Sequence, residues 1–284
     1  MAFSEVLLLG AIAGFTIYLG LPVSRLPRVD ERLRVALSMF SVGILAFIFM
    51  DVTRHGQEIV DTTLGSFKNH RTGLLHVVGL FTLLAAGFAA GTAGISTIQR
   101  SFRGRRVSTP PIAGGSTANA FSARELAAHA DVAQRAALHA GMTIAGAIGL
   151  HNFAEGLAIG VSAKTGAIGL AGVLVIGFAL HNATEGFGIT GPLGGARPSW
   201  TWLGLAGLVA GGPTLIGTIV GYQVHSDPLE LCFYALAGGA ILYVVGEIWT
   251  AVRRYGHRTL GLYLLAAGFM VGVATDLIVS YGGA

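Results

Sequence analysis

Eight long hydrophobic stretches, separated by shorter polar segments, dominate the pattern of the chain. They cover about residues 4–21, 33–52, 73–98, 136–162, 167–190, 201–222, 231–252 and 259–280. An α-helix needs roughly 20 mostly apolar residues to cross the hydrocarbon core of a bilayer, and each stretch is close to that length. The pattern therefore predicts an all-α polytopic membrane protein in which residues 1–284 form one transmembrane domain of eight helices.

The composition supports a chain that lies in a lipid bilayer. Charged residues make up 11% of it, whereas a soluble domain typically carries about 25%. The 43 glycines are typical of helices that pack closely in lipid. The formal net charge of +4 does not indicate a nucleic-acid partner, because the basic residues lie between the hydrophobic stretches.

The distribution of basic residues predicts the orientation. Loops on the cytoplasmic side of a membrane are enriched in Lys and Arg. The loops after the odd-numbered stretches are rich in arginine, whereas the other side has only Arg54, Lys68, Arg71 and Lys164. We therefore expect both termini on the outer side, and we read the first stretch as a membrane span and not as a cleaved signal peptide.

The longest connection, residues 99–135, is expected in the cytoplasm. It opens with a basic run at 100–106 and closes with a helix-like stretch from Ala123 to Leu138. The basic run suits contact with anionic lipid. A flexible loop that only sets the topology is the favoured interpretation, and lipid contact is the alternative.

One six-residue phrase occurs twice inside hydrophobic stretches. It reads His-Asn-Phe-Ala-Glu-Gly at 151–156 and His-Asn-Ala-Thr-Glu-Gly at 181–186. Ionisable groups are costly inside a membrane and usually have a function there. A His and a Glu four residues apart lie on one face of a helix. His151 and His181 are each 15 residues from a predicted turn at Gly166, so antiparallel helices would place them at one depth.

Imidazole and carboxylate groups together suit Zn²⁺ and similar divalent ions, and two carboxylates neutralise one dication. The alternative is that these groups only form hydrogen bonds between helices. The sequence thus predicts a metal site with six candidate ligands: His151, Asn152, Glu155, His181, Asn182 and Glu185. Five further residues are candidates for auxiliary or pathway positions: Asp51, His55 and Glu58 on one helix face at the outer mouth, and the isolated acids Glu247 and Asp276.

On these motifs the chain resembles the ZIP family of divalent-metal transporters, of the bacterial type. The resemblance implies a prokaryotic inner-membrane protein with eight spans and both termini outside, and it makes the six candidate ligands the transport site. It also implies two neighbouring metal positions that share the glutamates, and alternating access as the mechanism. A homodimer is left open.

The chain departs from the pattern of similar proteins at several positions. Ala154 and Thr184 stand where relatives usually have proline before the glutamate, and Gly212, before Pro213, stands where bacterial relatives often have a glutamate. Leu45 falls where some relatives offer a ligand. We therefore expect the second metal position to be weakened.

The function predicted from sequence is transport of divalent transition-metal ions. Zn²⁺ is favoured, with Fe²⁺, Mn²⁺, Co²⁺ and Cd²⁺ as further substrates and no other cofactor. No Gly-Lys-Ser/Thr phosphate loop is present, so ATP is not the expected energy source. A metal-selective channel is the main alternative. An intramembrane metallohydrolase is disfavoured, because its usual signature is His-Glu-x-x-His on one helix.

Overall fold

A computed structural model describes the chain except for residues 1, 27–29, 103–122, 165–167, 224–225 and 283–284. The secondary structure of the described part is entirely helical. The helices are α1 (Phe3–Phe15), α2 (Glu31–Lys68), α3 (Leu74–Ala89), α4 (Ile95–Phe102), α5 (Ala123–Lys164), α6 (Ile168–Thr190), α7 (Trp200–Gln223), α8 (Asp227–Val252) and α9 (Arg258–Gly282). Short 3₁₀ segments extend α1 (Thr16–Leu19 and Leu21–Arg25), α6 (Gly191–Leu193) and α8 (Arg253–Tyr255), and a π-turn (Ala90–Gly94) joins α3 to α4.

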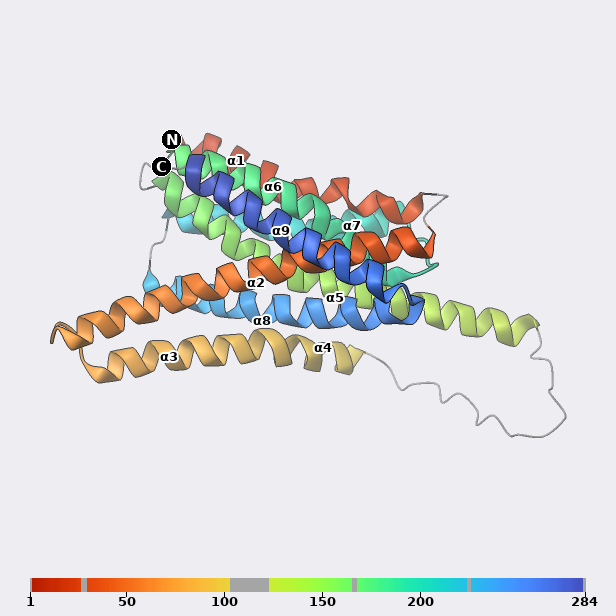
Figure 1. Cartoon of the computed structure of the whole chain (residues 1–284), viewed down its shortest axis with the longest axis horizontal. Coiled ribbons are helices and arrows are strands. Elements are labelled where there is room, and N and C mark those ends of the chain that lie inside the picture. Colours follow the sequence, from red (N-terminus) through yellow and green to blue (C-terminus); the bar gives the residue numbers. More distant parts are fainter. Residues whose placement is uncertain (1, 27–29, 103–122, 165–167, 224–225, 283–284) are drawn as a thin grey trace.

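Within the described residues, seven helical stretches are long and apolar enough to cross a membrane. They are Phe3–Arg25, Glu31–Lys68, Leu74–Thr97, Ala130–Lys164, Trp200–Gln223, Asp227–Tyr255 and Arg258–Ile278. The 23-residue α6 covers the remaining hydrophobic stretch of the sequence. The chain is therefore a polytopic membrane protein built from helices. Figure 1 shows these helices running side by side, with both termini at one end of the bundle.

Two helices are longer than the sequence pattern predicts. The second hydrophobic stretch was expected to end near residue 52, but α2 continues to Lys68 and has 38 residues. The polar residues from position 51 to 68 thus belong to the same helix as the second hydrophobic stretch. Similarly, the helix-like stretch from Ala123 and the span expected at 136 form one 42-residue helix, α5. The basic run at 103–106 and the turn at Gly166 lie outside the described residues.

The central packing brings α5 against α7 and α6 against α1. At the α5–α7 contact, a Cβ on Gly156 would lie 2.8 Å from the Thr218 backbone nitrogen, closer than side chains normally approach. Small residues allow such close approach of helices in membranes. The motif glycine on α6 has the same role, because a Cβ on Gly186 would lie 2.7 Å from the Leu21 nitrogen in the 3₁₀ segment after α1.

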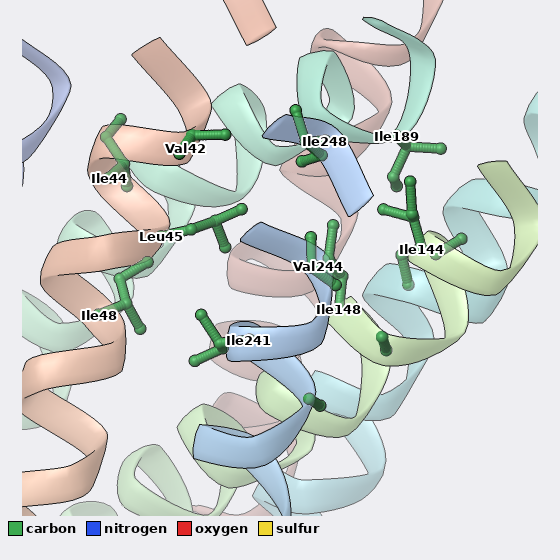
Figure 2. Close-up of a cluster of buried hydrophobic side chains, with 14 of the residues drawn as sticks. Val42, Ile44, Leu45, Ile48, Ile144, Ile148, Ile189, Ile241, Val244 and Ile248 are labelled. Carbon is green, nitrogen blue, oxygen red and sulfur yellow. The ribbon is translucent and has the colours of Figure 1, made fainter. Parts of the chain in front are cut away.

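A core of aliphatic side chains fills the space between α2, α5, α6 and α8 (Figure 2). Leu45 on α2, Ile144 and Ile148 on α5, Ile189 on α6 and Ile248 on α8 are each at most 2% exposed. The core includes Ile189, four residues after Glu185 at the C-terminal end of α6. It therefore holds α5 and α6 at fixed positions beside α2 and α8.

Candidate metal site

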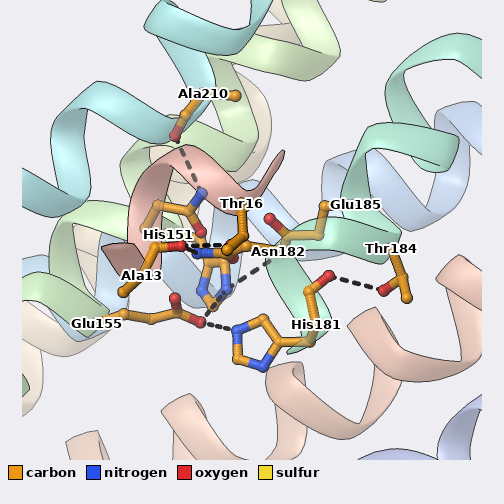
Figure 3. Close-up of polar contacts among 10 residues, drawn as sticks. Ala13, Thr16, His151, Glu155, His181, Asn182, Thr184, Glu185 and Ala210 are labelled. Carbon is orange, nitrogen blue, oxygen red and sulfur yellow. Dashed lines mark hydrogen bonds and ion pairs between the residues drawn. The ribbon is translucent and has the colours of Figure 1, made fainter. Parts of the chain in front are cut away.

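The two motifs face each other in the interior of the bundle. Glu155 on α5 lies between both imidazoles: its Oε1 is 2.8 Å from His151 Nε2 and 2.5 Å from His181 Nε2. Because His151 and Glu155 are one helical turn apart, α5 alone aligns them, whereas α6 supplies His181. Figure 3 shows these side chains converging from the two helices. One ligand atom from each of the three residues lies within 4.8 Å of the others.

The second glutamate lies at the edge of this cluster. Glu185 Oε1 is 3.5 Å from His151 Nε2, and the Glu185 side chain is fully buried on α6. Neither of its carboxylate oxygens has a hydrogen-bond partner among the described residues. A buried carboxylate is costly unless it is paired or binds a metal. The four residues therefore form one imidazole–carboxylate cluster in the bundle interior.

The two asparagines hold the motif helices to their neighbours. The Asn152 amide donates to the Ala210 carbonyl of α7, and the Asn182 amide donates to the Ala13 carbonyl of α1, each at 3.0 Å. Both side chains are fully buried, and both Oδ1 atoms are without a hydrogen-bond partner in the described part of the structure. The nitrogen of each amide thus joins two helices. The oxygen can coordinate a metal ion or accept a hydrogen bond from a metal-bound water.

A cavity of about 560 Å³ reaches the cluster from one side. Glu155 and His181 form part of its wall, and most of the rest is apolar. It extends along the middle of α2, from Phe40 to His55, and reaches the last turns of α9, where Asp276 and Ser280 line it. These turns lie at the end of the bundle that carries both termini (Figure 1). The cluster is therefore accessible from the end of the bundle predicted to be the outer one.

The structure separates the five auxiliary candidates. Asp51, His55 and Asp276 line the cavity, whereas Glu58 and Glu247 do not. Glu58 is instead bonded to Arg54, at 3.1 Å. Asp51, His55 and Glu58 were predicted to share one helix face. Of these three, Asp51 and His55 line the cavity and Glu58 does not.

Arg54 is a cavity residue that the sequence reasoning missed. Its guanidinium lies between Asp51 and Glu58, with both contacts at 3.1 Å, and it lines the cavity itself. Its position between the two acids, three residues after one and four before the other, is the signal that would have revealed this pairing. The mouth therefore contains a cation that offsets part of its negative charge.

Gly212, where the resemblance led us to look for a further ligand, provides none. Gly212 on α7 lies next to Pro213 inside the helix, and a Cβ built there would meet only Leu208 of its own helix. Leu45 on α2 is part of the aliphatic core. The ligand-type side chains at the centre thus all come from the two motifs on α5 and α6.

The fold and this cluster define a polytopic membrane protein with an imidazole–carboxylate site inside its helix bundle. A protein-family model described as "ZIP Zinc transporter" matches residues 116–246, a segment that contains both motifs and the helices that hold them. This part of the chain is thus similar to the ZIP family that the two motifs resemble.

A second similarity is to a curated protein. The chain is 30% identical over 154 residues to a protein named "Zinc transporter ZupT" from Clostridium perfringens (strain 13 / Type A). The match covers 52% of this chain and 53% of the relative. The chain thus aligns with about half the length of that relative.

Proposed function

We propose that the protein carries divalent transition-metal ions across a membrane, with Zn²⁺ as the favoured substrate. The observation that carries the proposal is the buried cluster in which Glu155 contacts the imidazoles of both motifs. The match of residues 116–246 to a family model described as "ZIP Zinc transporter" supports transport over an intramembrane hydrolase. The similarity to a zinc transporter from a bacterium likewise supports a bacterial inner membrane as the location.

The donor set suits an ion that must be bound and then released. Imidazole nitrogen and carboxylate oxygen bind Zn²⁺, Fe²⁺, Mn²⁺ and Co²⁺, and the two carboxylates Glu155 and Glu185 match the charge of one dication. No thiolate takes part, because Cys232 lies on α8 outside the cavity and the cluster. A site without thiolate binds less tightly, which favours turnover over permanent retention.

The proposed ligand set comprises the six motif residues. His151, Glu155 and His181 form the central group, Glu185 extends it, and the Oδ1 atoms of Asn152 and Asn182 complete it. A second ion that shared the glutamates would depend on these asparagine oxygens, because α7 provides glycine at position 212. We therefore propose one strong metal position and a weaker neighbour.

The topology that we propose has eight spans with both termini outside, and residues 99–135 in the cytoplasm. The cavity then faces outward, so the structure corresponds to the conformation that receives the ion. Alternating access requires a second conformation in which this cavity closes and the opposite side opens. A homodimer stays a prediction, since the site is formed within one chain.

Uptake into proteoliposomes tests the proposal. Purified wild-type protein should take up Zn²⁺ with saturable kinetics, whereas Glu155→Gln and His181→Ala should reduce uptake to the background of empty vesicles. Asp61→Asn is the matched control, because Asp61 on α2 is exposed and does not line the cavity. Unchanged uptake in Glu155→Gln and His181→Ala would refute the site.

The same assay separates a carrier from a channel. A carrier saturates and turns over slowly, whereas flux through a channel continues to rise with metal concentration. Because the cavity reaches the cluster from one side and does not border α6 beyond Thr184, we expect saturation.

A further inference from the structure

Two serines on α2 are buried without hydrogen bonds. Ser38 and Ser41 are both 0% exposed, and neither hydroxyl has a partner among the described residues. Hydroxyls in helices usually donate to the carbonyl four residues earlier, as Thr53 and Thr63 of the same helix do at 2.7 and 2.9 Å. An unsatisfied buried polar group costs roughly 1–3 kcal/mol. Two such groups on one helix face therefore require a functional explanation.

Both hydroxyls point into the contact between α2 and the C-terminal end of α6. A Cβ on Gly188 would lie 2.8 Å from Ser41 Oγ, and a Cβ on Gly191 would overlap the Ser38 hydroxyl. Because Gly188 and Gly191 have no side chains, the two hydroxyls fit between α2 and α6. We refer to Ser38, Ser41, Gly188 and Gly191 as the α2–α6 seam.

The seam continues from the metal cluster on the side away from the large cavity. Gly188 and Gly191 follow Glu185 by three and six residues, which corresponds to about 4.5 and 9 Å along a helix. The large cavity borders α6 only at residues 177–184. The two serine hydroxyls therefore lie one and two helical turns beyond Glu185, toward the opposite end of the bundle.

A small cavity lies at the far end of the seam. It has a volume of about 20 Å³, and Ser38, Thr190, Gly191, Ser24 and Arg34 line it. This volume is close to that needed for a single water molecule. Beyond Glu185, the polar side chains of Ser41, Ser38 and Ser24 thus follow one another as far as the 3₁₀ segment Leu21–Arg25, with gaps between them.

We propose that Ser41 and Ser38 line the route by which the metal ion leaves Glu185, and that the α2–α6 seam is the barrier that is closed in this structure. The inference rests on the proposed transport function. Hydroxyl oxygens replace water around a passing divalent ion, and because they are neutral they do not retain it. Separation of α6 from α2 would expose both hydroxyls to one continuous path.

Alanine substitutions distinguish this role from close packing. Ser41→Ala and Ser38→Ala keep the side chains small, so packing at the seam is preserved. With the hydroxyls removed, we expect the maximal rate of Zn²⁺ uptake to fall about threefold to tenfold, with KM unchanged because the outer cavity is intact. Ser66→Ala is the control, because Ser66 is on the same helix beyond the cavity. Wild-type rates in both seam variants would refute the proposal.

A thiol placed in the seam provides a second test. Thiolates bind soft ions such as Cd²⁺ far more strongly than Mn²⁺. If the ion passes position 41, Ser41→Cys should lower the ratio of Cd²⁺ to Mn²⁺ uptake by about fivefold or more through slow release, whereas Ser66→Cys should keep the wild-type ratio. A wild-type ratio in Ser41→Cys would exclude that route.

Failure of the route and failure of the transport function give different results in these assays. Wild-type protein that takes up no divalent ion contradicts the proposed function. Wild-type protein that transports, with seam variants that match it in rate and metal ratio, contradicts only the assignment of Ser38 and Ser41.

Discussion

Replacement of Gly156 by alanine should impair transport while the protein still folds. Gly156 follows Glu155 directly, and its α-carbon faces the backbone of α7. A Cβ there would lie 2.8 Å from the Thr218 nitrogen and 2.9 Å from the Thr214 carbonyl carbon, whereas ordinary contact begins at 3.4 Å. Both obstacles are backbone atoms, so no side chain can rotate to make room. The Thr214 carbonyl oxygen would lie closer still. The helices must therefore separate by about 1 Å, at a cost typical of overpacking, about 1–3 kcal/mol.

The displacement acts on the metal cluster through the neighbouring residue. Glu155 holds contacts of 2.8 and 2.5 Å to the two imidazoles, and binding groups need placement within about 0.5 Å. We therefore expect Gly156→Ala to lower Zn²⁺ uptake in proteoliposomes by at least about tenfold. The protein should still be purified as a folded species, with a reduced temperature of thermal unfolding in detergent.

Gly146→Ala is the matched control on the same helix. A Cβ at Gly146 would meet no atom within 4 Å, and alanine favours helix over glycine by about 1 kcal/mol. This variant should transport like the wild type, with an unchanged or higher unfolding temperature. Wild-type uptake by Gly156→Ala would show that close approach of α5 and α7 does not position the cluster.

Three further predictions concern the cavity mouth, the protonation of the ligands and the asparagine contacts. Arg54→Gln removes the cation between Asp51 and Glu58, so the apparent KM for Zn²⁺ should fall about twofold to threefold at low ionic strength and less in high salt; an increased KM in a salt series would contradict this. Metal binding requires deprotonated glutamate and neutral histidine, so Zn²⁺ affinity measured by titration calorimetry should decrease as the pH falls from 7.5 to 5.5, and a pH-independent affinity would exclude these ligands. Asn182→Ala breaks the bond between α6 and α1, and interhelical hydrogen bonds in membranes contribute about 0.6–1.7 kcal/mol; the unfolding temperature should fall measurably, and an unchanged temperature together with unchanged uptake would show that the amide is dispensable.

The hydrophobic pattern predicted where the helices are, but not how far they extend. Hydropathy falls sharply at Asp51 and Arg54, which led to an end of the second span near residue 52. The helix continues because its polar residues line the cavity or are exposed, and because Arg54 pairs with both Asp51 and Glu58 along it. Helix length depends on backbone propensity and caps as well as on apolarity, and hydropathy does not report these.

The repeated motif allowed the central cluster to be anticipated, because spacing of four on each helix and similar depth are properties of the sequence. The contacts of Asn152 with Ala210 and of Asn182 with Ala13 join residues 58 and 169 positions apart, and no local pattern encodes them. Ser38 and Ser41 were equally inaccessible to sequence reasoning. Serine is neutral in hydropathy, and only the packing of α2 on α6 shows that these hydroxyls lack partners.

The length of α2 and α5 has a practical consequence. At about 1.5 Å per residue these helices are roughly 57 and 63 Å long, about twice the thickness of a hydrocarbon core. Their overhanging ends project from opposite ends of the bundle (Figure 1). Spectroscopic labels attached there would sit in water, far from the bilayer, and a small tilt of either helix would be magnified at its tip. The distance between labels on the two ends would therefore report how α5, which carries His151 and Glu155, moves relative to α2.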